Sequence, residues 1–192
     1  FNDHATRYNT AIQKTVEIQD TYGGLSSACF LPGTMILMSD GSEKDIEYLN
    51  VGDEVMSINL PGLPDEDLGR DVWMPFTMDT MDNDGIALSE AFVESLFYDF
   101  EDGYYDINNG EIKVTKAHEF WVYTNGLWRW KRANELLSGM KLYQTSGKEL
   151  KISSIEWVGG DVEVIQFDVE PLDVYFAGGV LVHNKGTDSD PA

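Results

Sequence analysis

Near its end the sequence reads Val174-Tyr175-Phe176-Ala177-Gly178-Gly179-Val180-Leu181-Val182-His183-Asn184, and Lys185 follows. Apolar residues on both sides of a Gly-Gly pair are typical of strands around a turn. The last residues can break a bond, because the side-chain amide of Asn184 can attack its own backbone carbonyl. That attack forms a succinimide and releases Lys185. His183 can polarise the Asn184 carbonyl or protonate the departing Lys185 nitrogen.

Short strand patterns recur upstream of this stretch, separated by turn residues such as Asn108-Asn109-Gly110 and Thr124-Asn125-Gly126. The expected strands are residues 35–38, 54–58, 91–98, 104–107, 111–115, 119–123, 127–131, 148–158, 161–169 and 174–182, with turns at 159–160 and 177–179 and a helical turn at 133–137. Residues 60–88 have no clean period and are expected to form a loop or insertion. Many short strands at regular spacing predict an all-β fold.

The charge of the chain narrows its possible partners. The 192 residues carry a formal net charge of −21, and between residues 61 and 111 there are 14 acidic residues against one basic residue, Arg70. Such a surface repels phosphate, so we expect no nucleic-acid partner. No apolar run is long enough for a membrane span. We also expect no metal, because a calcium loop with Gly85 at its sixth position would place Ala91 where the loop needs Glu.

Any cysteine chemistry must come from Cys29, the single cysteine, which also excludes an internal disulfide and leaves the cellular location open. It follows the linker-like residues 22–27 and precedes Phe30-Leu31-Pro32-Gly33-Thr34. A thiol with an ordinary pKa of about 8.5 is little ionised at neutral pH, so a reactive Cys29 needs a base or an electropositive setting. Thr115 ends an expected strand and His118 follows three residues later; a histidine can protonate a leaving nitrogen.

In this order the motifs resemble those of the Hint superfamily, which comprises inteins, bacterial intein-like domains and hedgehog autoprocessing domains. The resemblance rests on residues 28–34 and 52–55, on Thr115 with His118, and on residues 178–184. It implies an all-β horseshoe with pseudo-twofold symmetry, spanning residues 29–184 with an acidic loop at about 60–90, between flanking segments 1–28 and 185–192.

The resemblance also implies a single-turnover, self-processing reaction without a cofactor. Cys29 would convert the Ala28–Cys29 bond to a thioester by an N–S acyl shift, with Thr115 straining that bond and His118 protonating its nitrogen. Asn184 would then cyclise with the help of His183. The substrate would be the chain's own flanking segments, and we expect a monomer.

Two positions depart from the family pattern. Many inteins carry a histidine just ahead of an aromatic pair, where this chain has Asp173 before Val174-Tyr175-Phe176. An aspartate can act as an acid or base when its pKa is raised, and Asp168 is a second candidate for this role. Splicing also needs Cys, Ser or Thr after the terminal Asn, and Lys185 is none of these. The resemblance therefore implies release of the flanks rather than conventional ligation, with aminolysis as a minor route.

Two other functions share these residues. A papain-like cysteine protease would use Cys29 and His118 with Asn134 or Asn184, but a helix should follow its cysteine, whereas Pro32-Gly33 follows here. An inactive acidic β-module that has kept only the fold is the second alternative. Dilution separates these functions, because self-cleavage proceeds at a rate that does not depend on protein concentration.

Overall fold

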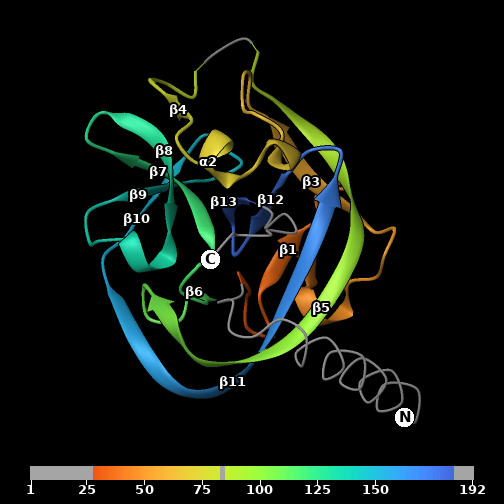
Figure 1. Cartoon of the computed structure of the whole chain (residues 1–192), viewed down its shortest axis with the longest axis vertical. Coiled ribbons are helices and arrows are strands. Elements are labelled where there is room, and N and C mark those ends of the chain that lie inside the picture. Colours follow the sequence, from red (N-terminus) through yellow and green to blue (C-terminus); the bar gives the residue numbers. More distant parts are fainter. Residues whose placement is uncertain (1–27, 83–84, 184–192) are drawn as a thin grey trace.

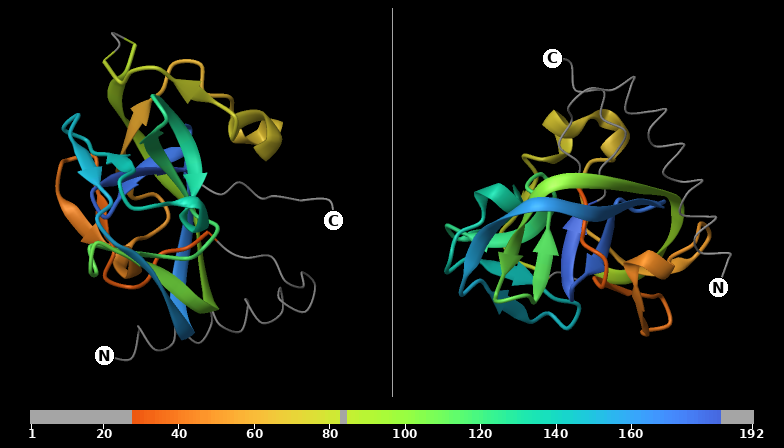
Figure 2. Two further views of the ribbon diagram at one scale, coloured as in Figure 1. Left: turned by 90° about the vertical axis from the view of Figure 1, so that its left-hand side faces the viewer. Right: turned by 90° about the horizontal axis from the view of Figure 1, so that it is seen from below.

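The computed structural model describes residues 28–82 and 85–183, and it confirms the all-β prediction with two antiparallel sheets (Figures 1 and 2). The larger sheet contains β1 (Met35–Leu37), β2 (Glu43–Asp45), β4 (Thr77–Met78), β7 (Glu119–Thr124), β8 (Leu127–Arg132), β9 (Lys141–Tyr143), β10 (Glu149–Lys151), β12 (Val174–Ala177) and β13 (Val180–His183). Its main path runs β10-β9-β7-β13-β12-β1-β2, with β8 beside β7 and β4 beside β8. The smaller sheet contains β3 (Glu54–Asn59), β5 (Ala87–Ile107), β6 (Ile112–Val114) and β11 (Ile155–Glu170).

The two longest strands, β5 and β11, run side by side as one long curved ribbon (Figure 1). The prediction of two strands at 91–98 and 104–107 and of a turn at 159–160 is wrong, because β5 and β11 are each continuous through these positions. The chain remains extended because Gly103 lies opposite Gly159, and a register shift follows between Gly159 and Val162. Gly103 has a φ of 152°, and a side chain on it would collide with the carbonyl oxygen of Val158. The glycines therefore bend a continuous ribbon instead of ending it.

Two predicted hairpin turns are confirmed. Asn108, Asn109 and Gly110 all have positive φ values, as do Asn125 and Gly126. These residue types tolerate the left-handed conformation that a tight hairpin requires. The expected helical turn is the 3-10 helix η3 (Ala133–Glu135), whereas the short strands β2 and β9 were not anticipated from the sequence.

The β12–β13 hairpin lies in the centre of the molecule and is buried on both faces. Alternate side chains enter two different apolar clusters, as expected when successive residues of a strand point to opposite faces. One cluster receives Tyr175, Ala177, Val180 and Val182, and the other receives Val174, Phe176 and Leu181. Double-sided burial therefore explains why this stretch is almost continuously apolar.

The acidic segment between β3 and β5 is more ordered than the expected loop. It contains the 3-10 helix η2 (Glu66–Leu68), the short helix α2 (Arg70–Trp73) and strand β4, which pairs with the edge of β8. Trp73 is buried in the apolar cluster that also contains Val174, Phe176 and Leu181, called here the aromatic cluster because it holds four tryptophans, and this contact anchors the segment. The remaining short helix, η1 (Ile46–Tyr48), follows β2. None of the helices in the described ranges is long and apolar enough to cross a membrane.

The ribbon geometry predicts different effects for two glycine substitutions. Gly103→Ala should lower the free energy of unfolding by about 3 kcal/mol, because the new methyl group collides with backbone. Gly160→Ala is the control, since Gly160 also has a positive φ, 139°, but faces open space. It should lose only about 1 kcal/mol from backbone strain. Urea unfolding followed by circular dichroism measures both, and equal losses would contradict the close approach at Gly103.

Candidate functional site

Cys29 lies against the smaller sheet, between β11 and the end of β6. Both Ala28 and Cys29 are buried, and the next residue, Phe30, exchanges two backbone hydrogen bonds with Ile165 of β11, of 3.0 and 2.8 Å. On the other side the backbone N–H of Thr115 donates to the carbonyl oxygen of Cys29 at 2.9 Å. The backbone around Cys29 is therefore held from two strands at once.

The Thr115 side chain contacts the peptide bond that precedes Cys29. The Cys29 N–H donates to Thr115 Oγ1 at 2.8 Å, and that hydroxyl donates to the Cys29 carbonyl oxygen at 3.2 Å. Because the side chain is almost completely buried, water does not compete for these bonds. The hydroxyl group holds the nitrogen of the Ala28–Cys29 bond in one place.

The Cys29 thiol lies next to Gln166 of β11, a polar residue that was not predicted from the sequence. The Cys29 Sγ atom is 3.9 Å from Oε1 of Gln166. Asp168 lies two residues further along β11 and accepts a hydrogen bond from the Ser95 hydroxyl at 2.9 Å. Alternation along a strand links Gln166 to Asp168, and this was the signal that could have identified it.

Tyr175 lies in the same region. Its complete burial raises the pKa of its hydroxyl well above the ordinary value, and Asp168 and Cys29 both add to the shift through their charge. The hydroxyl therefore stays neutral and can donate a hydrogen bond across the working pH range.

His118 contacts Phe30, the residue that follows Cys29. Its imidazole packs edge-on against the ring of Phe30, with 4.3 Å between ring centroids, and lies 6.4 Å from the ring of Tyr175. The backbone fixes this position, because His118 N–H donates to Thr115 and Ala133 N–H donates to His118. The structure thus brings Cys29 together with Thr115 and His118, which lie far from it in the sequence, just after β6.

His183, at the end of β13, lies in an aromatic setting. Its imidazole stacks on Trp73 with 3.7 Å between centroids and 7° between planes, and it meets Trp130 edge-on at 5.0 Å and 88°. On the neighbouring strand β12 the residue opposite His183 is Val174. Trp73 was not predicted as part of the site, although a lone tryptophan within a strongly acidic segment is unusual and indicates a buried contact.

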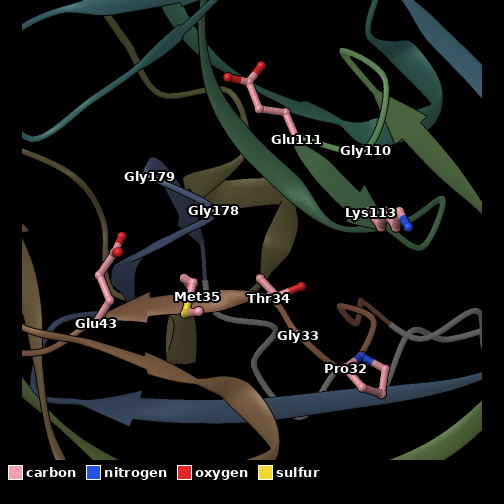
Figure 3. A pocket seen from close by; sticks show the side chains of 10 residues that line it. All are labelled: Pro32, Gly33, Thr34, Met35, Glu43, Gly110, Glu111, Lys113, Gly178 and Gly179. Atoms are coloured by element: carbon pink, nitrogen blue, oxygen red, sulfur yellow. The ribbon is translucent and has the colours of Figure 1, made fainter.

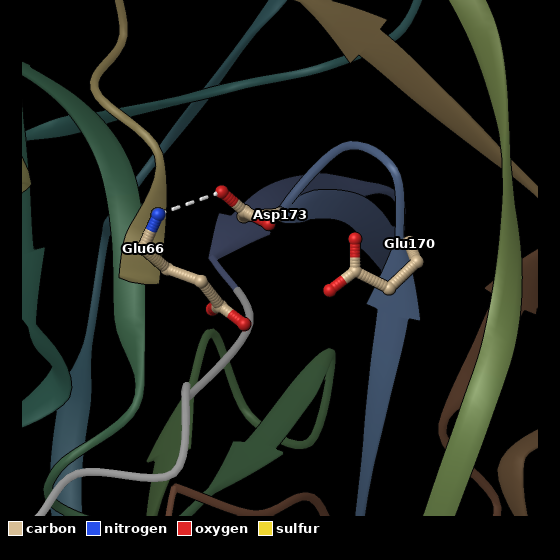
Figure 4. A group of neighbouring side chains, drawn as sticks. All are labelled: Glu66, Glu170 and Asp173. Atoms are coloured by element: carbon tan, nitrogen blue, oxygen red, sulfur yellow. Dashed lines mark hydrogen bonds between the residues drawn. The ribbon is translucent and has the colours of Figure 1, made fainter. Parts of the chain in front are cut away.

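Asp173 precedes Val174 and is buried to 9% exposure. Its Oδ2 accepts a hydrogen bond from the backbone N–H of Glu66 at 3.0 Å, and carboxylate oxygens of Glu66, Glu170 and Asp173 lie within 4.8 Å of one another (Figure 4). Burial raises the pKa of Asp173 to about 6, helped by the negative charges of Asp65, Glu170 and Asp67 and opposed by the Glu66 hydrogen bond. Its carboxyl group therefore titrates near neutral pH.

The predicted site residues fall into two neighbouring groups by their contacts. Cys29, Thr115 and His118 make an N-terminal group, and His183 and Asp173 make a C-terminal group at the open end of the central hairpin, where Val182 pairs with Phe120 of β7, two residues after His118. The groups are connected through β12 and β13, where Tyr175 pairs with Val182. Asn184 and Lys185 lie outside the described residues. Asn134, the alternative protease residue, lies in η3 and is exposed, with its N–H bonded to Lys116.

A pocket of about 470 Å³ lies beside the turn that follows Cys29 (Figure 3). It is lined by Pro32, Gly33, Thr34, Met35, Glu43, Gly110, Glu111, Lys113, Gly178 and Gly179. Cys29 is not among these residues and is only 2% exposed. The pocket therefore does not open onto the thiol.

Comparison with known proteins gives results at the level of structure. No family model and no curated protein sequence matches the chain. The solution structure of a bacterial intein-like domain from Clostridium thermocellum is similar, with a TM-score of 0.63 and 25% identity over 83% of this chain and 100% of that one. A DnaB intein from Synechocystis sp. PCC 6803 is similar with a TM-score of 0.57 and 21% sequence identity. The gp41-1 intein is similar with a TM-score of 0.55 and 21% sequence identity. Each match covers 83% of this chain and 100% of the other chain.

The likeness to the bacterial intein-like domain extends over 83% of the chain and agrees with the motifs that the sequence places at Cys29, at Thr115 with His118, and before Asn184. On this evidence the chain belongs to the Hint superfamily, the group of folds that includes inteins and bacterial intein-like domains.

Proposed function

We propose that this chain cuts its own backbone at two bonds, Ala28–Cys29 and Asn184–Lys185. The observation that carries the proposal is the buried pair of hydrogen bonds between the Thr115 side chain and Cys29. Any buried N–H needs an acceptor, but here one hydroxyl group bonds both the nitrogen and the carbonyl oxygen of Cys29, which supports a fixed orientation of the Ala28–Cys29 bond. In this proposal residues 29–184 are the self-processing domain, and residues 1–28 and 185–192 are the segments that it releases.

At the N-terminal bond the Cys29 sulfur attacks the Ala28 carbonyl carbon. A C–S bond forms, the C–N bond breaks, and the proton lost by the thiol is balanced by one gained at the Cys29 nitrogen. A peptide nitrogen is a poor leaving group, so it must be protonated as the bond breaks, and His118 is the nearby acid that we assign to this step. Gln166 and Thr115 hold the thiol and the amide while the thioester forms.

At the C-terminal bond the Asn184 amide nitrogen attacks the Asn184 carbonyl carbon. The amide gives up a proton, the bond to Lys185 breaks, and the Lys185 nitrogen gains a proton. Asp173 is our candidate for the base and His183 for the group that polarises the carbonyl or protonates the leaving nitrogen. A carboxyl group with a pKa near 6 is suited to this role, because it is ionised yet basic at neutral pH.

Lys185 determines the products that we propose. Its side chain is an ammonium group, which cannot receive the N-terminal segment from the thioester as Cys, Ser or Thr would. The thioester is therefore lost to water or to an added thiol, and the flanks are released separately. Attack by an amine, which would join the flanks, remains the minor route.

The burial of Cys29 argues against the protease alternative. A protease that acts on other chains needs an open cleft at its nucleophile, whereas Cys29 is 2% exposed and is followed by backbone paired to β11 rather than by a helix. The second alternative, an inactive β-module, is distinguished from a self-cleaving domain by whether the wild-type chain releases its flanks.

The central prediction concerns the two nucleophiles. The wild-type chain should release both flanks, Cys29→Ala should abolish release at Ala28–Cys29, and Asn184→Ala should abolish release at Asn184–Lys185. Intact-mass measurement with and without dithiothreitol identifies each fragment. A tenfold dilution series is the control, since the rates must not change with concentration. If all three chains stay whole, the inactive module is the correct reading.

The Thr115 clamp is tested by two substitutions. Thr115→Val keeps the shape but removes both hydrogen bonds, and it should slow dithiothreitol-induced cleavage at Ala28–Cys29 roughly tenfold or more, because the peptide bond loses its alignment. Thr115→Ser keeps the hydroxyl group and should retain most of the rate. Equal rates for the Val and Ser variants would refute a role for the hydroxyl group.

The pKa of Asp173 predicts a pH dependence. A base acts in its deprotonated form, so cleavage at Asn184–Lys185 should accelerate as the pH rises through about 6 and level off above it. Asp173→Asn should lower the plateau and remove this rise. Rates measured by mass from pH 4.5 to 8.5, in a Cys29→Ala background, give the profile. An unchanged rise in the Asn variant would assign the titration to another group.

A further inference from the structure

A short part of the acidic segment contacts both side chains of the C-terminal group. Trp73 of α2 stacks on the imidazole of His183, and the backbone N–H of Glu66 in η2 donates to Asp173. The two contacts come from residues seven positions apart in the chain. Figure 1 places α2 directly above β12 and β13, in agreement with these contacts.

The helix that carries Trp73 is anchored through charge as well as apolar packing. The Arg70 side chain forms an ion pair with the carboxylate of Glu119, which is fully buried on β7 and follows His118 in the chain. The Arg70 guanidinium group also lies 5.8 Å from the centre of the Trp73 ring. Moving α2 away would leave the buried Glu119 carboxylate without its Arg70 partner, which is strongly destabilising. The ion pair therefore holds α2 in place beside β7 and β13.

The stacking geometry restricts the rotation of the His183 imidazole ring. Trp73 covers one face of the imidazole, and Trp130 meets the ring at a right angle, while the two tryptophans are themselves perpendicular. Hydrogen bonds to imidazole lie in the plane of the ring, from the two nitrogens. A partner on the face therefore fixes the plane and leaves the nitrogen edges able to reach a peptide bond.

We propose that Trp73 is a positioning residue for the C-terminal cleavage: its indole holds the His183 imidazole in the plane from which it acts on the Asn184–Lys185 bond. The inference rests on the proposed function. It gives the acidic segment a role in the reaction. Trp73 is not part of the motifs at Cys29, Thr115 and His118.

The same placement makes the effect selective. Trp73 contacts His183 and Trp130, whereas Cys29 is held by Thr115 and Gln166 in the other group. Loss of the indole should therefore slow cleavage at Asn184–Lys185 and leave cleavage at Ala28–Cys29 unchanged. A purely structural tryptophan would affect both bonds together.

The experiment compares Trp73→Leu, which keeps apolar bulk, with Trp73→Phe, which keeps an aromatic face, and uses Val72→Ala, an exposed neighbour, as the matched control. We expect Trp73→Leu to slow C-terminal cleavage at least about tenfold and Trp73→Phe to recover to within about threefold of wild type. Dithiothreitol-induced cleavage at Ala28–Cys29 should stay within about twofold of wild type in all three variants. Both rates come from intact-mass time courses.

A spectroscopic measurement tests the stack without cleavage. In chains carrying Asn184→Ala, the His183 ring protons should be shifted upfield by the indole ring current, and Trp73→Leu should remove that shift. With only three histidines in the chain, a His183→Gln spectrum assigns the signals.

Three results would overturn the inference: unchanged His183 signals in Trp73→Leu, equal C-terminal rates in the Leu and wild-type chains, or an equal fall in both cleavages. A wild-type chain that never cleaves at Asn184–Lys185 would refute the proposed function and with it this role. Normal wild-type cleavage with a fully active Trp73→Leu chain would refute the role of Trp73 alone.

Discussion

The pairing of β11 with β5 is the constraint on which the rest of the molecule depends. It runs from Ile155 opposite Ile107 to Glu170 opposite Phe92. One end of β5 pairs with β6, which leads directly to Thr115, and the middle of β11 receives Phe30. A slip of one residue would turn Gln166 and Asp168 to the opposite face of the strand and leave the Cys29 thiol among other side chains. The register of the ribbon therefore sets the contents of the N-terminal group.

The two groups of site residues differ in their surroundings, and the difference matches the chemistry that each would perform. Cys29 sits against a mainly apolar core, and the Thr115 hydroxyl group and the Gln166 amide lie beside it. That setting holds and desolvates a peptide bond. The C-terminal group combines an imidazole between aromatic rings with an aspartate whose pKa is near 6. That setting favours proton transfer near neutral pH. The β12–β13 hairpin connects the groups through Tyr175 and Val182.

The acidic segment affects the C-terminal group through two different physical effects. Its carboxylates at Asp65 and Asp67 act at a distance and help to raise the pKa of Asp173. Its one tryptophan acts by contact, because burying Trp73 in the aromatic cluster brings α2 onto His183. A high net charge in this segment is therefore compatible with a defined structure, since Trp73 and other apolar side chains pack on the core while Asp65 and Asp67 are exposed.

Local patterns in the sequence determined the fold class, the hairpin turns at Asn108-Asn109-Gly110 and Asn125-Gly126, and the identity of the residues at Cys29, Thr115 and His118. These depend on interactions between near neighbours or on motifs that keep their order along the chain. Only the tertiary structure decided that β5 and β11 are continuous, because the glycines that suggest a turn are needed for close approach of two distant strands. It alone placed Gln166 beside Cys29 and Trp73 on His183, since contacts across more than a hundred residues leave no periodic signal in a single sequence.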